Sequence, residues 1–263
     1  MPRLGVLLDG IMEKIGLGGS NIIPLMLGYG CGIPGIMATR NFSTRKQRII
    51  VSGAISLAVP CIAQTGAFIA LLSEGSLLLV PAIFLFSLLI IMTAGVLLER
   101  MLPGERPVTP MEIPPLLRPR VDVVFKKVFV KIKRFMVNGE LPLILGIGDA
   151  AILFESGIME IVGAALSPVV TGWLHLPEEL AVPLMLGVFC RELTVLLMLE
   201  MDLNSLQLFT GAVLGLLYVP CIAVIAVLTS EFNLKMALGV LFITTAMAFV
   251  LGGAVANLGA LFI

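Results

Sequence analysis

Charge is what this sequence has least of. Asp, Glu, Lys and Arg together make up 13% of its 263 residues, whereas a soluble domain carries about 25%. Apolar residues make up 59% of the chain, and its mean hydropathy is +1.10. A water-soluble fold of this length could not bury so much apolar surface. The scarcity of charge therefore excludes a soluble domain and predicts an integral membrane protein.

Other absences exclude further classes of protein. The formal net charge is zero, which favours no charged partner, and we expect no nucleic acid among the partners. Four cysteines without a closely spaced pair do not indicate a disulfide framework. No nucleophile–base or zinc-ligand spacing is present, so an enzyme is not expected. Asp9 and Glu13 follow a short N-terminal apolar run that has no small-residue cleavage site, so a cleaved signal peptide is not expected either.

Several apolar stretches are candidates for membrane segments. Four of them meet or approach the roughly 20 residues that a spanning helix needs: Ile49–Leu72, Leu77–Leu98, Leu206–Leu228 and Met236–Ile263. Three more are short or are interrupted by charge or glycine, and one further stretch is a candidate eighth: Leu180–Leu199, Leu141–Phe154, Ile22–Thr39 and Ile158–Leu174. The sequence therefore predicts an all-α, polytopic membrane protein with about seven or eight membrane segments.

The placement of Lys and Arg predicts the orientation of the chain. Loop 40–48 carries four of these residues and segment 99–140 carries nine, with two predicted spans between them, whereas residues 155–179 carry none. Basic loops are retained in the cytoplasm. We therefore expect a multi-pass protein of the cell membrane, with both basic regions in the cytoplasm and residues 155–179 outside.

The second basic region contains an amphipathic segment, VDVVFKKVFVKIKRFM at 121–136. On a helical wheel its five Lys and Arg residues face one way, and its Val, Phe, Ile and Met residues face the other. This pattern predicts a helix in the cytoplasmic headgroup layer of the lipid bilayer. A binding site for a calmodulin-like partner is the alternative. The proline-rich residues 109–120 before it predict a stiff, non-helical connector.

Two sets of related motifs occur in the chain. LMLGYGC at 25–31 resembles LMLGVFC at 184–190, and VPCIA occurs both at 59–63 and at 219–223. Cys31 and Cys61 are 30 positions apart, and Cys190 and Cys221 are 31 apart. The two sets account for every cysteine of the chain: Cys31, Cys61, Cys190 and Cys221.

We infer from these motifs that the protein consists of two repeated halves, 1–98 and 180–263. The connector between them, 99–179, holds the basic helix and a short membrane segment. Such duplication is typical of secondary transporters, whose substrate site lies near mid-membrane between the halves. The halves are parallel if residues 141–174 cross the membrane once and inverted if they cross it twice, and the sequence leaves both open.

The first motif lies in a stretch that is apolar but poorly suited to a helix. It is rich in residues that weaken or break helices: Gly28, Gly30, Gly32, Pro34 and Gly35. Backbone without helical hydrogen bonds is tolerated only inside protein or along a watery cavity, so we expect a discontinuous or re-entrant segment. Pro60 and Pro220 lie inside predicted spans, where they should release the carbonyls of Ser56 and Leu216.

Each of these predicted breaks carries a cysteine. Cys31 lies in the glycine-rich stretch, and Cys61 and Cys221 directly follow the two prolines. Thiolate sulfur and carbonyl oxygen suit a divalent transition metal such as Fe(II). We therefore predict a metal pathway with Cys31 and Cys221 as principal ligands and with Cys61 and Cys190 as secondary ones. The alternative is that the cysteines are small apolar fillers and the glycines allow close helix packing.

Charged residues near the middle of predicted membrane segments include Asp149, Arg191 and Glu192. Charge at this depth is costly and marks a candidate functional site. Asp149 is a candidate partner for Arg191, and such a pair could equally serve only to join two helices. Glu192 is a candidate oxygen ligand for a passing cation.

At these residues the sequence resembles the membrane portion of the FeoB-type ferrous iron transporters. GYGCGIPGIMATR at 28–40 resembles the family's first Gate motif, typically G-F-G-C-N-V-P-A-I-M-A-T-R, and YVPCIAVIAV at 218–227 resembles the second. PMEIPPLLRPR at 110–120 resembles the connector M-E-L-P-x-Y-x-x-P, and GVFCRELTV at 187–195 resembles G-x-x-A-K-E-V-V-V. The resemblance covers nearly the whole chain and implies Fe(II) as the transported ion.

The sequence also departs from the family pattern. Gly32 stands where an asparagine usually follows the first Gate cysteine, and Arg191 stands where a lysine is usual. The family's GTP-binding domain, its phosphate loop G-x-x-x-x-G-K-[ST] and its early membrane segment are missing from this sequence, so no nucleotide is bound by that route. We expect a split-off permease subunit, a fragment or a descendant of the family. A separate GTP-binding protein or a homo-oligomer is then the expected partner.

Three functions follow from these observations. The leading hypothesis is a permease for ferrous iron or a related divalent metal, which passes along cysteines and freed carbonyls. The second is a permease for a nucleoside or another organic solute, because nucleoside-recognition proteins share the Gate architecture. The third is a non-transporting membrane subunit that docks a partner through the basic helix at 121–137.

Overall fold

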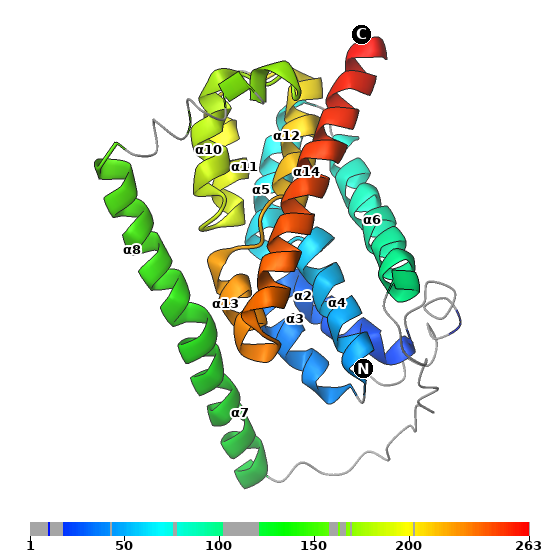
Figure 1. Ribbon diagram of the computed structural model, residues 1–263, viewed down its shortest axis with the longest axis vertical. Coiled ribbons are helices and arrows are strands. Elements are labelled where there is room, and N and C mark those ends of the chain that lie inside the picture. Colours follow the sequence, from blue (N-terminus) through cyan, green and yellow to red (C-terminus); the bar gives the residue numbers. More distant parts are fainter. Residues whose placement is uncertain are drawn as a thin grey trace.

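The computed structural model describes residues 10, 18–42, 44–75, 78–101, 121–157, 163, 167–168, 170–201 and 203–262. Within these ranges all regular structure is helical, so the predicted all-α class is confirmed (Figure 1). The main helices are α2 Ile22–Gly30, α3 Gly32–Ala38, α4 Arg45–Ala58, α5 Ile62–Gly75, α6 Leu79–Met101, α7 Val121–Phe135, α8 Leu141–Glu155, α10 Ala181–Leu186, α11 Arg191–Leu197, α12 Ser205–Leu217, α13 Ile222–Glu231 and α14 Leu234–Phe262.

Four helical units are long and apolar enough to cross a membrane: Arg45–Ser73, Leu79–Met101, Ser205–Glu231 and Leu234–Gly259. They coincide with the four long spans expected from hydropathy. The first unit is interrupted between α4 and α5 and the third between α12 and α13, where Pro60 and Pro220 occur. A proline lacks the N–H that continues a helical ladder, so each span is built from two half-helices.

The two other long apolar stretches do not form single spans. Residues 22–39 form α2 and α3, which fold back on one another. A Cβ atom on Gly35 would lie 2.9 Å from the Cα of Gly28, so only glycine allows the two backbones to approach this closely. Residues 180–199 form α10 and α11, which are joined by a hydrogen bond of 3.2 Å from Thr194 Oγ1 to the Pro183 carbonyl.

None of these four short helices is long enough to cross a bilayer. At 1.5 Å per residue, even the nine residues of α2 cover less than half of the hydrocarbon thickness. The predicted count of seven or eight membrane segments is therefore not confirmed. The candidate segment Ile158–Leu174 lies largely outside the described residues.

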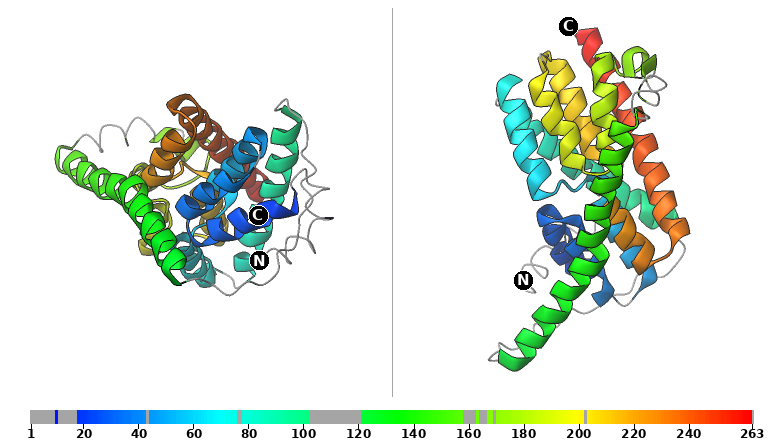
Figure 2. Two further views of the ribbon diagram at one scale, coloured as in Figure 1. Left: turned by 90° about the horizontal axis from the view of Figure 1, so that it is seen from below. Right: turned by 90° about the vertical axis from the view of Figure 1, so that its left-hand side faces the viewer.

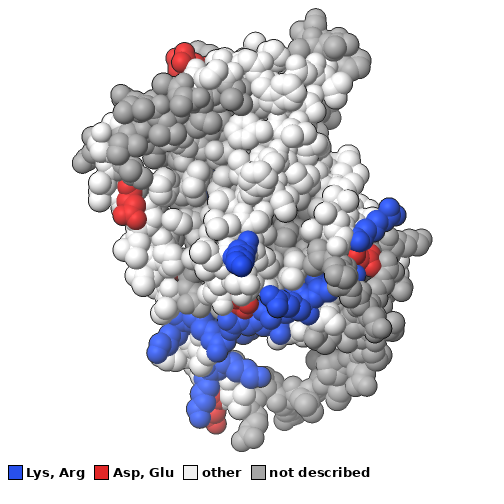
Figure 3. Space-filling model, viewed as in Figure 1, with Lys and Arg blue, Asp and Glu red and all other residues white. Residues whose placement is uncertain are grey.

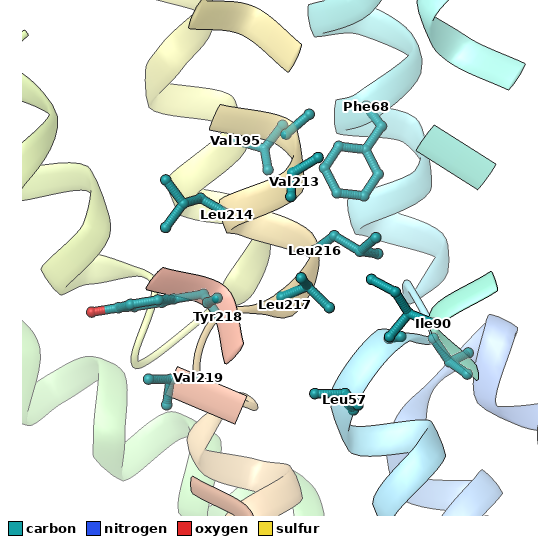
Figure 4. Close-up of a cluster of buried hydrophobic side chains, with 14 of the residues drawn as sticks. Leu57, Phe68, Ile90, Val195, Val213, Leu214, Leu216, Leu217, Tyr218 and Val219 are labelled. Carbon is teal, nitrogen blue, oxygen red and sulfur yellow. The ribbon is translucent and has the colours of Figure 1, made fainter. Parts of the chain in front are cut away.

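The core is centred on α12, whose buried face runs from Leu208 to Leu217. Figure 4 shows α12 side chains between Phe68 of α5, Ile90 of α6 and Val195 of α11. Glycine on α12 allows these neighbours to approach, because a Cβ on Gly215 would lie 2.8 Å from the Val195 side chain. The shorter helices α10 and α11 are thereby held against the broken spans.

α7 and α8 form one long rod, since the π-helical turn Met136–Glu140 joins them without a break. The rod crosses the outside of the bundle, and α7 extends beyond it (Figure 2). No side chain of α7 is buried. A Cβ on Gly139 would lie 2.8 Å from Ile33, and one on Gly146 would lie 2.9 Å from Ile222, so the rod packs against α3 and α13. The location of α7 in a headgroup layer stays a prediction.

The two ends of the molecule differ in charge. Lys and Arg residues gather towards the lower end of the face seen in Figure 3. At this end Arg40 and Arg48, which flank the α3–α4 connection, both form ion pairs with Glu231 at the end of α13. α6 runs towards this end and α14 runs away from it (Figure 1).

Candidate ion pathway

All four cysteines lie at interruptions of the helices, each directly before the second helix of a pair. Cys31 has an extended backbone (φ −159°, ψ 136°) between α2 and α3, and Cys61 directly precedes α5. Cys190 (φ −138°, ψ 113°) and Cys221 are the N-cap residues of α11 and α13. All four are free thiols.

The residues around each interruption explain its position. Pro60 and Pro220 end α4 and α12, as the sequence predicts, while Gly30 and Gly32 flank Cys31. Pro34 does not break a helix. It lies in the first turn of α3, where its missing N–H has no helical partner to lose.

Three of the four interruptions meet at the guanidinium of Arg191, the first residue of α11. Arg191 Nη2 donates hydrogen bonds to the carbonyls of Ser56 (2.7 Å) and Tyr218 (2.8 Å), and Nε donates to the carbonyl of Val219 (3.1 Å). The guanidinium thus joins the ends of α4 and α12 to the start of α11. Sequence reasoning expected Ser56 to have a released carbonyl, but it did not find the side chain that binds it.

The fourth interruption lies close by. A Cβ on Gly32, next to Cys31, would lie 3.1 Å from Val224 on the first turn of α13. Cys31 thus lies near the start of α13, where Cys221 is the N-cap residue. The structure therefore brings together the four helix interruptions at which the cysteines lie.

These thiols do not form a closed chelate. Cys31, Cys61 and Cys221 are partly exposed and Cys190 is buried. Within the part of the chain that the structure describes, no group of three or more His, Cys, Asp and Glu side chains is arranged to hold a metal ion. The described residues therefore show no structural metal centre of the usual four-ligand kind.

Side chains satisfy further carbonyls at the ends of the broken helices. Ser87 Oγ donates to the Ala58 carbonyl at 2.6 Å, and Gln64 Nε2 donates to the Gly215 carbonyl at 2.7 Å. Of the two carbonyls that the sequence analysis expected to be released, that of Ser56 is bound by Arg191, and Ser87 and Gln64 bind two other carbonyls at the same helix ends. Buried carbonyls without partners would be costly, which explains why the apolar spans contain these few polar residues.

Gln64 is a site residue that sequence reasoning missed. It is fully buried, its backbone N–H lies 3.4 Å from Cys61 Sγ, and its side-chain Oε1 has no hydrogen-bond partner in the structure. The sequence did contain a signal for Gln64: it is a polar residue one turn after Cys61 inside an apolar span, and a polar side chain there is not expected to face lipid. The side-chain amide of Gln64 is directed to α12 by the hydrogen bond from Nε2 to the Gly215 carbonyl, and Oε1 is a buried oxygen of the same amide.

The intramembrane charges are arranged differently from the predicted pair. Asp149 is exposed on α8, whereas Arg191 is 8% exposed. Among the described residues no ion pair joins these two, and the partners of Arg191 are the three carbonyls. Glu192, the second residue of α11, is partly buried.

The fold and this site define an integral membrane protein whose interrupted helices bring thiols together. Two family models match the chain: "Nucleoside recognition", the Gate family, over residues 1–75, and "Ferrous iron transport protein B C terminus" over residues 80–131. With the relatives below, these matches show that the chain is related to the membrane portion of the FeoB-type ferrous iron transporters. The resemblance found in the Gate stretch is confirmed.

Curated relatives match along most of the chain. The Fe(2+) transporter FeoB of Methanocaldococcus jannaschii is 25% identical over 90% of this chain and 41% of its own length. FeoB of Staphylococcus aureus is 22% identical, over 88% of this chain and 39% of its own length. A Porphyromonas gingivalis protein that fuses Fe(2+) transport protein A to FeoB is 29% identical over 52% of this chain. The chain thus spans about two fifths of the length of the first two relatives. No solved structure is a significant match.

Proposed function

We propose that the chain is a membrane permease for ferrous iron or a related divalent metal. The observation that carries the proposal is the meeting of four helix interruptions, each with a free thiol. Sulfur is a favourable ligand for Fe(II). An ion that moves among pairs of thiols is bound weakly enough to leave each of them. Relatives that are named Fe(2+) transporters support iron as the cargo.

In this proposal Cys31 and Cys221 are the principal ligands, with Cys61, Cys190 and Glu192 secondary. The glycines of the α2–α3 hairpin allow the Cys31 backbone to reach this place. Backbone carbonyls contribute less than the sequence analysis expected, because Arg191, Ser87 and Gln64 hold several of them. The buried Oε1 of Gln64, which has no hydrogen-bond partner in the structure, is a further candidate oxygen ligand.

We also propose that the two halves are inverted repeats. A hairpin, a broken span and a long helix follow one another twice, as α2–α3, α4–α5, α6 and again as α10–α11, α12–α13, α14. The opposite directions of α6 and α14 support inversion (Figure 1). The sequence-based criterion assumed that 22–39 and 180–199 each cross the membrane. Once both are hairpins, a single crossing by α8 suffices for inversion.

The orientation of the chain follows from the same proposal. The end that carries Arg40, Arg48 and the basic α7 faces the cytoplasm of a cell-membrane protein, as the rule for basic loops requires. The exposed apolar side chains of α6, α8 and α14 then face lipid. A separate GTP-binding protein or a second copy of the chain is the expected partner.

Metal uptake by the purified chain tests the proposal. The chain is placed in liposomes that enclose an Fe(II)-sensitive dye, under anaerobic conditions. Wild type should take up Fe(II). The double variant Cys31→Ser, Cys221→Ser should take it up at least roughly tenfold more slowly, as metal sites do when groups that support the metal are removed. Met101→Leu, a sulfur-removing change at an exposed position, is the matched control and should match wild type.

Undiminished Fe(II) uptake by the double variant would reject the thiol pathway. The Gate family's description favours one alternative, a nucleoside or other organic-solute permease. That alternative predicts nucleoside uptake that the same two substitutions do not affect. If no solute crosses at all and a second protein co-purifies through α7, the chain is instead a docking subunit.

A further inference from the structure

Arg191 is a buried charge whose partners are uncharged. It is 8% exposed, and each of its three hydrogen bonds goes to a backbone carbonyl. Within the described residues it forms no ion pair. A charge at this depth needs compensation, and here only peptide dipoles supply it through direct contact.

The three carbonyls come from the ends of two different half-helices. Ser56 lies in the last turn of α4, and Tyr218 and Val219 directly follow α12. The C-terminal end of a helix carries partial negative charge. The two helix ends thus direct three carbonyl oxygens, and their partial negative charge, at one guanidinium. We call these three oxygens the carbonyl cradle. Converging carbonyl oxygens are the ligands that take the place of water around small cations in channels.

We propose that the carbonyl cradle is a cation site and that Arg191 is its tethered occupant, which closes it to free ions. The inference rests on the proposed transport function and adds a selectivity device to it. The guanidinium takes the place of a bound cation at these three oxygens. Alkali cations, which need oxygen ligands, find the cradle filled. A divalent transition metal that also binds sulfur, such as Fe(II), does not depend on the cradle, because it can bind the thiols of Cys61 and Cys221.

The position of Arg191 also explains a departure from the resembled family pattern, in which lysine is usual. An ammonium group carries the same charge, but it lacks the planar fork that reaches carbonyls on two helices at once. Arginine therefore fills the cradle more completely. The structural contrast between fork and point charge gives the experiment its graded series of variants.

Potassium leak from liposomes tests this inference without any metal. The purified chain is placed in K⁺-loaded vesicles, and K⁺ release is followed for wild type, Arg191→Ala, Arg191→Gln and Arg191→Lys. Arg45→Ala, at an exposed arginine outside the cradle, is the control. The two neutral variants should release K⁺ roughly tenfold faster than wild type, because the fixed charge and its steric block are gone. The lysine variant should leak more slowly than the neutral variants but faster than wild type, and the control should match wild type.

Chemical rescue distinguishes a guanidinium that blocks the carbonyl cradle from one that only stabilises the packing of the helices. Methylguanidinium added to Arg191→Ala should slow the leak towards the wild-type rate, because it can refill the carbonyl cradle. The proposal is overturned if folded neutral variants do not leak, if methylguanidinium has no effect, or if Arg191→Lys leaks as fast as Arg191→Ala. If neither neutral variant folds, the role of Arg191 is structural alone, and the proposal is overturned as well. Fe(II) uptake is measured on the same preparations. Graded K⁺ leak without Fe(II) uptake in any variant would keep the cradle and reject the iron permease.

Discussion

Within the first hairpin, glycines that look alike in the sequence meet different surroundings. A Cβ on Gly35 would lie 2.9 Å from both the Cα and the N of Gly28, which are backbone atoms that cannot move aside. A Cβ on Gly30 would have nothing within 4 Å. Neither residue has a positive φ. The two positions therefore differ in space alone, which makes them a matched pair.

We predict that Gly35→Ala destabilises the protein and that Gly30→Ala does not. The added methyl at residue 35 forces α2 and α3 apart, at a cost of about 1–3 kcal/mol. At residue 30 the reduced backbone freedom of the unfolded chain gives a change of about zero or a small gain. Thermal unfolding of the two variants in the same detergent measures the difference. Equal melting temperatures would show that the hairpin is looser than described.

At the residue scale the sequence identified sulfur but not its neighbours. Cys31, Cys61, Cys190 and Cys221 could be selected because they recur in matched motifs next to proline or glycine, and the structure places them at helix interruptions. Arg191 could be selected as costly, but its carbonyl partners lie 27 to 135 positions away along the chain. A pattern read along the sequence carries no information about such contacts. Asp149 was therefore the nearest available guess.

Among the helices, the end of α13 is held by two arginines from one connection. Glu231 has a side chain that is 2% exposed, and it accepts hydrogen bonds from Arg40 Nε at 2.6 Å and from Arg48 Nη2 at 3.1 Å. Arg48 also lies over the ring of Phe232, 5.0 Å from its centroid. These contacts tie the α3–α4 connection to α13 at the basic end of the molecule.

We predict that Glu231→Gln lowers the free energy of unfolding by about 1–3 kcal/mol, because hydrogen bonds to a buried carboxylate are stronger than those to an amide. Glu200→Gln, at an exposed position, should leave it unchanged. Unfolding of both variants is measured in detergent at low and high salt. The Arg40 contact is more exposed than the Arg48 contact. The contribution of the Arg40–Glu231 contact to the free energy of unfolding should therefore decrease as the salt concentration rises. If Glu231→Gln is as stable as wild type, the ion pairs of Glu231 with Arg40 and Arg48 do not stabilise the protein, contrary to this prediction.

At the scale of helices, hydropathy predicted the four long spans, and the glycine- and proline-rich composition of residues 22–39 predicted a discontinuous segment there, but the reversal within residues 180–199 was not predicted. The four long spans were found because each has a continuous apolar run. Residues 180–199 are also largely apolar but carry Arg191 and Glu192, and there Cys190 adopts an extended conformation and the chain turns back before Arg191. Burying that guanidinium inside one straight helix would leave its donors facing lipid. Folding as a hairpin brings them to the ends of α4 and α12, which hydropathy alone cannot show.

Over the whole molecule, the ion pairs and the helix order place two exposed positions at opposite ends. Arg45 begins α4 beside the Arg40–Glu231 contact, while Glu200 shortly precedes α12, at the far end of the Ser205–Glu231 span. If that unit crosses the membrane, these positions face different compartments.

We predict that Arg45→Cys and Glu200→Cys label from opposite sides of the membrane. A membrane-impermeant maleimide added to right-side-out vesicles should react with the cysteine at residue 200 only, and added to inside-out vesicles with the one at residue 45 only. Wild type, which keeps its four native thiols, gives the background. Labelling of both variants from one side would reject the topology drawn from the basic residues.

The rod of α7 and α8 has a mechanical consequence. Its basic arm lies outside the bundle, while farther along it Gly139 bears on Ile33 and Gly146 bears on Ile222. Ile33 comes two residues after Cys31, and Ile222 comes directly after Cys221. No break separates the exposed α7 from these two contacts. A partner that tilts or twists α7 would therefore also displace Ile33 and Ile222, which are next to the two thiols.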